Sequence, residues 1–196
     1  DSADQIKICE YNVAVALKNT GKYKEAYDAF IALNGHADSK AQADSILNEH
    51  RLEIYQSTKV GDIFTFGSYE QDANTVNVKE YIEWLVLAKE NNRLLLLSLY
   101  ALDSQPYNEK YTWVTWETCT LRKWLNNDFL NEAFSNTEKA IIPTVTVSAE
   151  KNPGYNTSPG NATQDKVFLL SLSEVNKYFV SNSTRVCNPT VYARIQ

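Results

Sequence analysis

Residues that commonly bind metals or carry out catalysis are scarce in this chain. Its 196 residues include no methionine, two histidines (His36 and His50) and three cysteines (Cys9, Cys119 and Cys187). No C-x-x-C pair occurs, so the sequence argues against a zinc site. The odd cysteine count allows at most one internal disulfide, and a pair between Cys119 and Cys187 is left open because spacing alone does not fix its geometry.

Clusters of positive charge and long apolar runs are also lacking. The formal net charge is −5 and no polybasic cluster occurs, which argues against nucleic acid and anionic membranes as partners. The longest apolar run, at 94–97, has the length of a strand, so the sequence predicts no membrane span. The chain begins at Asp1 without a signal peptide, and we expect it to be a trimmed piece of a longer protein.

Residues 1–57 show the apolar spacing of helices, and we expect three of them. Ala26 and Phe30 match the A-x3-F element in the second helix of a tetratricopeptide repeat, to which this segment is similar. The small Ala26 would let a partner helix approach, and Phe30 would fill the groove. One such unit does not bury its own face, so we expect it to pack on upstream repeats, another copy or the following domain.

Residues 58–196 mix strand and helix patterns without regular βαβ alternation, which favours an α+β domain. Two apolar runs flank Asn91-Asn92, and this arrangement predicts a β-hairpin. Ser135 and Glu138 predict a capped helix, and Ser173 is expected to begin another. Further strands are expected at 63–66, 144–147 and 167–170, and a long surface loop at 148–165.

A series of motifs from about residue 61 onward resembles a known family. IEWLVL, LLLLSLYALD, TWETCTLRKWLN, KVFLLS and NPTVYA follow one another in this order. The pattern resembles bacterial domains of unknown function found in large cell-envelope or secreted proteins. That family resembles, more distantly, the C-type-lectin-like fold of formylglycine-generating enzymes. The resemblance implies a C-type-lectin-like α+β domain and an extracellular or cell-envelope location.

The end of the chain departs from the family pattern. Members continue beyond the segment matching NPTVYA into two further strands, whereas this sequence stops at Gln196. We therefore expect an incomplete domain whose sheet has an unpaired edge. Because unpaired backbone groups recruit other strands, this edge predicts self-association with another copy.

Cys119, between Trp116 and Trp124, is the first candidate for a reactive residue. A catalytic thiol needs a neighbouring cation, His⁺ or helix N-terminus to lower its pKa. Neither histidine lies in this domain, and no cysteine pair matches that of the copper-dependent formylglycine-generating enzymes. The resemblance thus implies the fold rather than the activity. We expect no catalytic residue, with an enzyme derived from that fold as the alternative.

Two sets of side chains are candidates for a calcium site. Asn126, Asn127 and Asp128 loosely match the Trp-Asn-Asp motif at which C-type lectins bind calcium, and the alternative is that they end one helix and begin the next. The second set lies in the long loop and consists of Asn152, Asn156, Asn161 and Asp165. Its alternative is a solvated loop of turn residues. No cofactor is expected apart from calcium.

Arg122 has two interpretations. It is either a cation that faces a ligand or an arginine paired with Glu117 or Asp128.

Residues 103–117 form a polar loop rich in aromatic rings. Its candidate binding residues are Tyr107, Asn108, Tyr111, Trp113 and Trp116. Rings with amide and carboxylate neighbours suit sugar or peptide recognition, and the alternative is a loop pinned to the domain by its rings. We expect a non-catalytic recognition or assembly module that binds a protein or glycan. A structural spacer with protein-binding helices is a further alternative.

Overall fold

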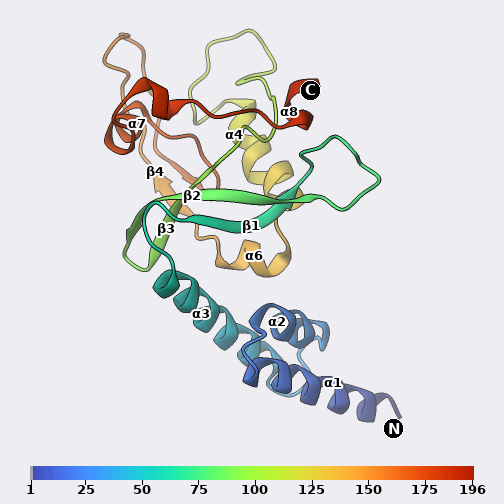
Figure 1. The fold of residues 1–196 in the computed structure, drawn as a ribbon. Helices are drawn as coiled ribbons and strands as arrows, with labels where there is room; N and C mark the ends of the chain where they lie inside the picture. The colour runs from blue at the N-terminus through green and yellow to red at the C-terminus, as the bar shows by residue number, and fades with distance from the viewer. Residues whose placement is uncertain (1) are drawn as a thin grey trace. The chain divides into compact units, whose positions relative to one another are not determined.

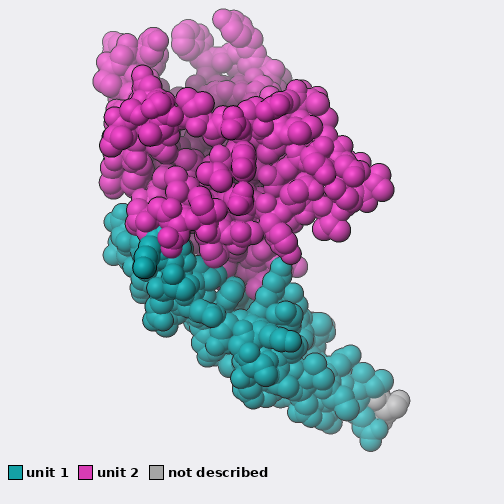
Figure 2. Space-filling model, viewed as in Figure 1, with its two compact units in different colours: residues 1–59, 89–94 teal, residues 60–88, 95–196 magenta. Residues whose placement is uncertain are grey.

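The computed structural model describes residues 2–196, and the fold is α+β as predicted (Figure 1). The chain divides into two compact units (Figure 2). The first, the helical unit, comprises residues 1–59 and 89–94, and the second, the mixed unit, comprises residues 60–88 and 95–196. The sequence placed a division after residue 57 but did not assign 89–94 to the helices.

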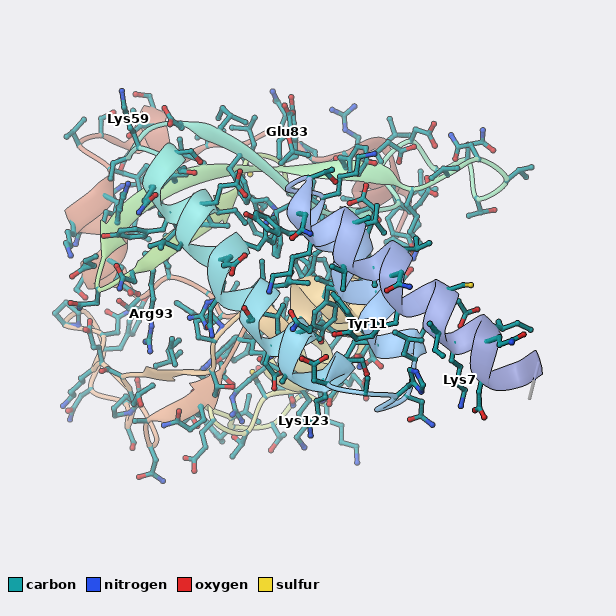
Figure 3. All side chains as sticks on the ribbon, turned by 90° about the horizontal axis from the view of Figure 1, so that it is seen from below. Lys7, Tyr11, Lys59, Glu83, Arg93 and Lys123 are labelled. Carbon is teal, nitrogen blue, oxygen red and sulfur yellow. The ribbon has the colours of Figure 1, made fainter. Side chains whose placement is uncertain are left out.

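The helical unit contains α1 (Ser2–Asn19), α2 (Tyr23–Ala32) and α3 (Ser39–Ser57). Ala26 and Phe30 are fully buried, in the packing roles expected of this pair. The core also holds Ala14, Leu33, Ala43 and Ile46. Tyr11 of α1, labelled in Figure 3, donates a hydrogen bond to Asp38 just before α3.

The three longest strands form an antiparallel sheet in the order β1-β2-β3. They are β1 (Ile63–Tyr69), β2 (Glu80–Glu90) and β3 (Arg93–Ser98). Asn91 and Asn92 have φ of 54° and 57°, the left-handed values that a tight two-residue hairpin turn requires, so the predicted hairpin is confirmed. Strands β1 and β3 are the outer strands of this sheet.

A helical stretch follows the sheet and contributes to the core of the mixed unit. It runs through α4 (Thr120–Trp124), the π-helix η1 (Leu125–Phe129) and α5 (Leu130–Ala133). Phe129 and Phe134 are buried, and the Trp124 and Phe129 ring centroids lie 5.6 Å apart. The segment is therefore a packing centre of the mixed unit. The full cluster comprises Tyr69, Ile82, Leu102, Phe129, Leu130, Ala133 and Phe134.

Gly67 lets the sheet approach this stretch closely. Its φ is 73°, and a Cβ there would lie 2.6 Å from Cε1 of Phe134. A side chain at this position would therefore meet both backbone strain and a clash. The Gly67 N–H also donates to the Glu138 carboxylate, so one backbone group of the outer strand β1 is paired with a side chain.

The remaining elements match the sequence only in part. The Ser135 and Glu138 capping box begins α6 (Asn136–Ile141) as predicted. β4 (Val145–Val147) pairs with β5 (Thr163–Asp165), which lies inside the predicted loop, while 167–170 is not a strand. Ser171 rather than Ser173 caps α7 (Leu172–Tyr178). The C-terminal part holds the 3-10 turn η2 (Asn182–Arg185) and α8 (Val191–Ile195).

Candidate functional site

The aromatic loop, residues 103–118, is fastened at its first half to the start of α4. The Leu121 N–H donates to the Tyr107 carbonyl (3.2 Å), and the Thr120 N–H donates to Oδ1 of Asn108 (3.1 Å). Nδ2 of Asn108 donates to the Lys110 carbonyl at 2.7 Å. Asn108 therefore organises the loop from within.

The second half of the loop is anchored by a buried carboxylate. The Asp165 side chain has no exposed surface and lies 2.7 Å from Nε of Arg122. Its other oxygen accepts from Nε1 of Trp116 (3.0 Å) and from the Thr163 hydroxyl (2.5 Å). Because a buried charge needs such partners, this network ties the loop firmly to β5.

The network corrects the sequence interpretation of Arg122. Its ion-pair partner is Asp165, and not Glu117 or Asp128. Glu117 contributes its backbone carbonyl, which accepts from Nη1 of Arg122 at 3.2 Å. The pairing was not apparent from the sequence, because 42 residues lie between Arg122 and Asp165 and the segment that leads to Asp165 has turn composition.

Exposure separates the predicted binding residues into two groups. The Tyr111 side chain is fully exposed and Trp113 is 94% exposed. Trp116 and Asn108 are partly buried and serve as anchors. Tyr107 is 45% exposed, and burial, followed by the neighbouring Cys119 thiol, raises its pKa to about 12. The loop is therefore not pinned by its outer rings, which face solvent.

A second loop, residues 148–162, meets the aromatic loop at its base. Asn161 donates to the Glu117 carboxylate from its backbone N–H (3.0 Å) and from Nδ2 (3.1 and 3.0 Å). These donors lower the pKa of Glu117. Gly160 has a φ of 82°, and a Cβ there would lie 2.6 Å from Oγ1 of Thr115. Sequence reasoning did not connect these loops.

Cys119 is fully buried and plays a structural part. Its Sγ accepts from the Arg122 N–H and donates to the Trp116 carbonyl, each at 3.4 Å, so the thiol caps α4. Cys9 and Cys187 are exposed, and all three cysteines are free. The structure therefore does not contain the disulfide between Cys119 and Cys187 that the sequence left open.

The first calcium candidates are occupied by other contacts. Oδ1 of Asn126 accepts from the backbone N–H groups of Lys166 (2.8 Å) and Val167 (3.2 Å). Nδ2 of Asn127 donates to the Lys123 carbonyl at 2.7 Å. Calcium here stays a prediction, and binding would require Asn126 to release two donors.

The four candidates of the long loop are engaged by four different partners. Asn161 binds Glu117, and Asp165 lies in the buried network. Oδ1 of Asn152 accepts from the Gly154 N–H, and Oδ1 of Asn156 accepts from Nζ of Lys151. The side-chain oxygens of Asn152, Asn156 and Asp165 thus accept hydrogen bonds, whereas Asn161 binds through its nitrogens.

The described residues do bring three carboxylates together elsewhere. Oxygens of Glu70, Asp72 and Glu80 lie within 4.8 Å of one another beside the β1–β2 connection. They accept backbone N–H groups, because Asn74 donates to Glu70 and Asp72, and Gln71 donates to Glu80. The Asn74 N–H, above all, lowers the pKa of Asp72. These carboxylates offer oxygen ligands that a hard cation accepts, and they also have a turn-forming role.

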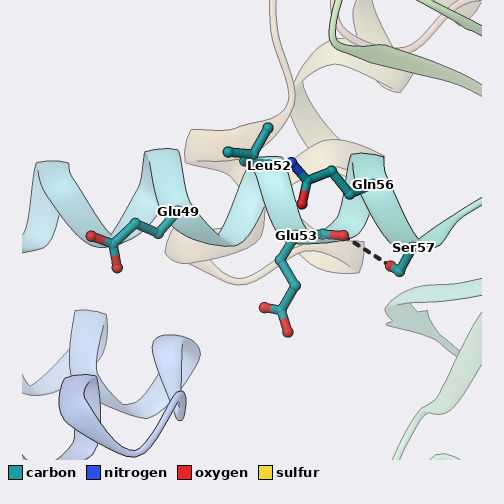
Figure 4. Close-up of a pocket in the computed structure, with 5 residues that line it drawn as sticks. All are labelled: Glu49, Leu52, Glu53, Gln56 and Ser57. Atoms are coloured by element: carbon teal, nitrogen blue, oxygen red, sulfur yellow. Dashed lines mark hydrogen bonds between the residues drawn. The ribbon is translucent and has the colours of Figure 1, made fainter.

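The helical unit carries a shallow hollow of about 440 Å³ (Figure 4). It is lined along one face of α3 by Glu49, Leu52, Glu53, Gln56 and Ser57. Ser57 donates to the Glu53 carbonyl at 2.9 Å. All five lining residues come from this one helix.

Comparison with known protein families places the two loops within a matched region. The family model described as "Domain of unknown function (DUF6273)" matches residues 91–192, just over half of the chain. The matched range contains both loops and their connecting contacts. Neither the curated proteins nor the solved structures gave a match. Among the helices of residues 2–196, none combines the length and apolar character needed to cross a membrane.

Proposed function

We propose a recognition function for this chain, which belongs to the family of domains of unknown function DUF6273. In this proposal it is a non-catalytic module that binds a glycan through Tyr111 and Trp113. The observation that carries the proposal is the exposure of these two rings on a loop whose base is fastened by hydrogen bonds. Large exposed aromatic surface on an ordered support is typical of a binding site.

The chemistry of the aromatic loop favours a sugar. A ring face offers a flat apolar surface to the C–H groups of a pyranose, and the neighbouring polar side chains can form hydrogen bonds with the sugar hydroxyls. Glu109 and Lys110 lie in the same exposed stretch and carry opposite charges. The surface therefore has no strong preference for a charged ligand.

The state of the thiols supports binding rather than catalysis. Cys119 is buried and already makes two hydrogen bonds, so it is poorly placed to react with a substrate. We expect a thiol reagent to label Cys9 and Cys187 in the native protein and Cys119 only after unfolding. Rapid labelling of native Cys119 would favour the alternative of an enzyme derived from the formylglycine-generating fold.

The wider setting of the module is also part of the proposal. The motifs resemble bacterial cell-envelope and secreted domains, which supports an extracellular or envelope location and a C-type-lectin-like fold. The outer positions of β1 and β3 support self-association through an unpaired edge. Sedimentation over a range of concentrations tests this part, and a monomer at all concentrations would contradict it.

The central test is ligand binding by the full chain. A glycan array identifies the ligand, and titration calorimetry measures its affinity for the wild type and for Trp113→Ala. Loss of one stacked ring is expected to weaken binding about tenfold. Tyr81→Ala is the matched control, because Tyr81 is 75% exposed on β2 outside the aromatic loop.

Three outcomes would contradict or redirect the proposal. A folded protein that binds no glycan, or a Trp113→Ala variant of unchanged affinity, would refute glycan binding at these rings. Binding to a peptide array alone would assign a protein partner instead. Loss of binding on adding a chelator would show that calcium takes part in binding, whereas stacking on the exposed rings needs no metal ion.

A further inference from the structure

We infer that the binding site spans two loops, with the 148–162 loop as its second wall and Tyr155 as its second stacking ring. The inference rests on the proposed function and makes it more specific. The ligand class is a neutral oligosaccharide long enough to contact both loops.

The first step is the contact between Asn161 and Glu117, here named the clasp. The two residues lie 44 positions apart in the chain, yet the Glu117 carboxylate accepts from both the backbone and the side chain of Asn161. Three donors on one carboxylate fix both the distance and the orientation of the two loops. The loops are therefore joined at their bases.

The second step is the position of the clasp relative to the rings. Thr115 contacts Gly160 so closely that a Cβ on the glycine would lie 2.6 Å from the threonine Oγ1. Thr115 is only two residues from Trp113, and Gly160 is five residues from Tyr155. Close to the clasp in the sequence, Asp165 accepts a hydrogen bond from Trp116 and pairs with Arg122. The joined bases thus lie next to the segments that carry the rings.

The third step is the order and exposure of the second loop. Both loops project from the same end of the mixed unit (Figure 1). Tyr155 is 70% exposed, so its ring is available. The loop around it is held by the bonds from Gly154 to Asn152 (2.9 Å) and from Lys151 to Asn156 (2.7 Å). An ordered support lowers the entropic cost of binding.

The fourth step concerns the charge of the ligand. Within residues 150–158, Glu150 and Lys151 balance each other. Glu117 is engaged by Asn161, and Glu109 and Lys110 again have opposite signs. The remaining carboxylate of the aromatic loop, Asp103, accepts a hydrogen bond from Tyr69. Neither loop therefore presents a cluster of free charges of one sign, and both loop sequences are rich in amide and hydroxyl side chains. Such a surface matches uncharged sugar hydroxyls better than sulfates or uronates.

The experiment measures binding of neutral oligosaccharide ladders to the full chain. Cello- and chito-oligosaccharides of increasing length are titrated by calorimetry and by NMR of the isotope-labelled protein. Affinity is expected to rise with length, and the amide signals of both loops are expected to shift. Tyr155→Ala should weaken binding of the longest oligomer about tenfold, as Trp113→Ala does. Tyr81→Ala should leave the affinity unchanged.

A charge exchange tests the positioning role of the clasp. Asn161→Asp replaces the amide donor by a second carboxylate facing Glu117, and we expect about tenfold weaker binding with the core intact. The double variant Glu117→Gln with Asn161→Asp reverses donor and acceptor and should restore the affinity. A purely structural effect on stability would lower the melting temperature without this rescue.

The outcomes separate the inference from the proposed function. Suppose that oligosaccharides bind and that Trp113→Ala weakens binding, but that Tyr155→Ala keeps the wild-type affinity and the amide signals of the second loop do not shift. The two-loop site is then refuted, and the aromatic loop alone forms the binding site. Preference for heparin fragments over both neutral ladders would refute the neutral ligand class. If neither the ladders nor the glycan array shows binding, the proposed function itself fails.

Discussion

The helical unit and the mixed unit are stabilised by different kinds of contact. Three of the six core residues of the helical unit are alanines, so its helices approach closely and Phe30 provides the largest buried side chain. The mixed unit buries a cluster of rings and, separately, the charged side chain of Asp165. The first kind of packing follows a local sequence period, and the second depends on residues far apart in the chain.

The largest effect is expected from breaking the long-range contact between Asp165 and Arg122. Asp165→Ala removes the partner of Arg122 and leaves its charge uncompensated, which should lower the free energy of unfolding by roughly 3–5 kcal/mol. Denaturant titration measures the loss, and hydrogen exchange should show it in the mixed unit. Asp165→Asn is the matched control, because it keeps the shape and should cost less. A loss below about 1 kcal/mol for the alanine variant would show that the anchor is dispensable.

Phe30→Ala tests the local contact of the helical unit. Removing this fully buried ring should cost about 3–5 kcal/mol at most, with the lower end favoured because the small unit can collapse around the cavity. Hydrogen exchange should show faster exchange in α1, α2 and α3. Ile31→Ala, at the adjacent but 48% exposed position, is the control and should have a small effect. Equal effects of the two variants would contradict the assigned core.

Gly67→Ala tests the close approach of sheet and helix in the mixed unit. The added Cβ meets Phe134 and adopts a positive φ, so a loss of about 1–3 kcal/mol is expected. Gly61→Ala separates the two causes, because Gly61 has a φ of 91° with no atom within 4 Å of the added Cβ. Thermal unfolding should place Gly67→Ala below Gly61→Ala. The reverse order would mean that Phe134 moves aside easily.

The smallest effect concerns the acid sensitivity of the clasp. Because Asn161 lowers the pKa of Glu117 below its ordinary value of 4.5, the stabilising contribution of the clasp is present above that pH and is lost as pH falls through the lower, folded-state pKa. NMR titration of the Asn161 amide should give a midpoint below 4.5. In Asn161→Ala the Glu117 midpoint should rise. An unchanged midpoint would mean that the clasp does not bind the carboxylate preferentially.

The sequence predicted the elements that local patterns specify. Asn91-Asn92 fixed the hairpin because both residues tolerate a positive φ, and Ser135 with Glu138 specified the start of α6. Ala26 and Phe30 were identified by their helical spacing. Each of these features depends on residues within a few positions of one another, so the chain pattern is sufficient to find them.

The contacts of the site were not predictable in the same way. Asp165 lies in a segment with turn composition, where a carboxylate is usually solvated, yet here it meets Arg122 and Trp116. β5 has the sequence TQD, which lacks the apolar alternation of a strand and forms through pairing with β4. Conversely, the apolar run at 167–170 has no strand partner in the described chain. Pairing over long distances decided these cases.

The aromatic rings of the loop were predictable only in part. The sequence identified Tyr107, Tyr111, Trp113 and Trp116 as one aromatic group. It did not distinguish anchors from solvent-facing rings, because that distinction depends on Asp165 for Trp116 and on burial beside Cys119 for Tyr107. The long-range contacts therefore define which part of a locally visible motif is available to a ligand.

The hairpin tip at 89–94 has a practical consequence for dividing this protein. Nζ of Lys89 donates to the Thr58 carbonyl at 2.8 Å and lies 4.5 Å from the centroid of the Tyr55 ring. A fragment of residues 1–59 would lose this ammonium group, and a fragment of residues 60–196 would keep it without its acceptor and its ring. The family match begins at residue 91, inside the same tip. Boundaries that follow the linear sequence therefore cut through a compact unit, and fragments intended for separate study need both segments.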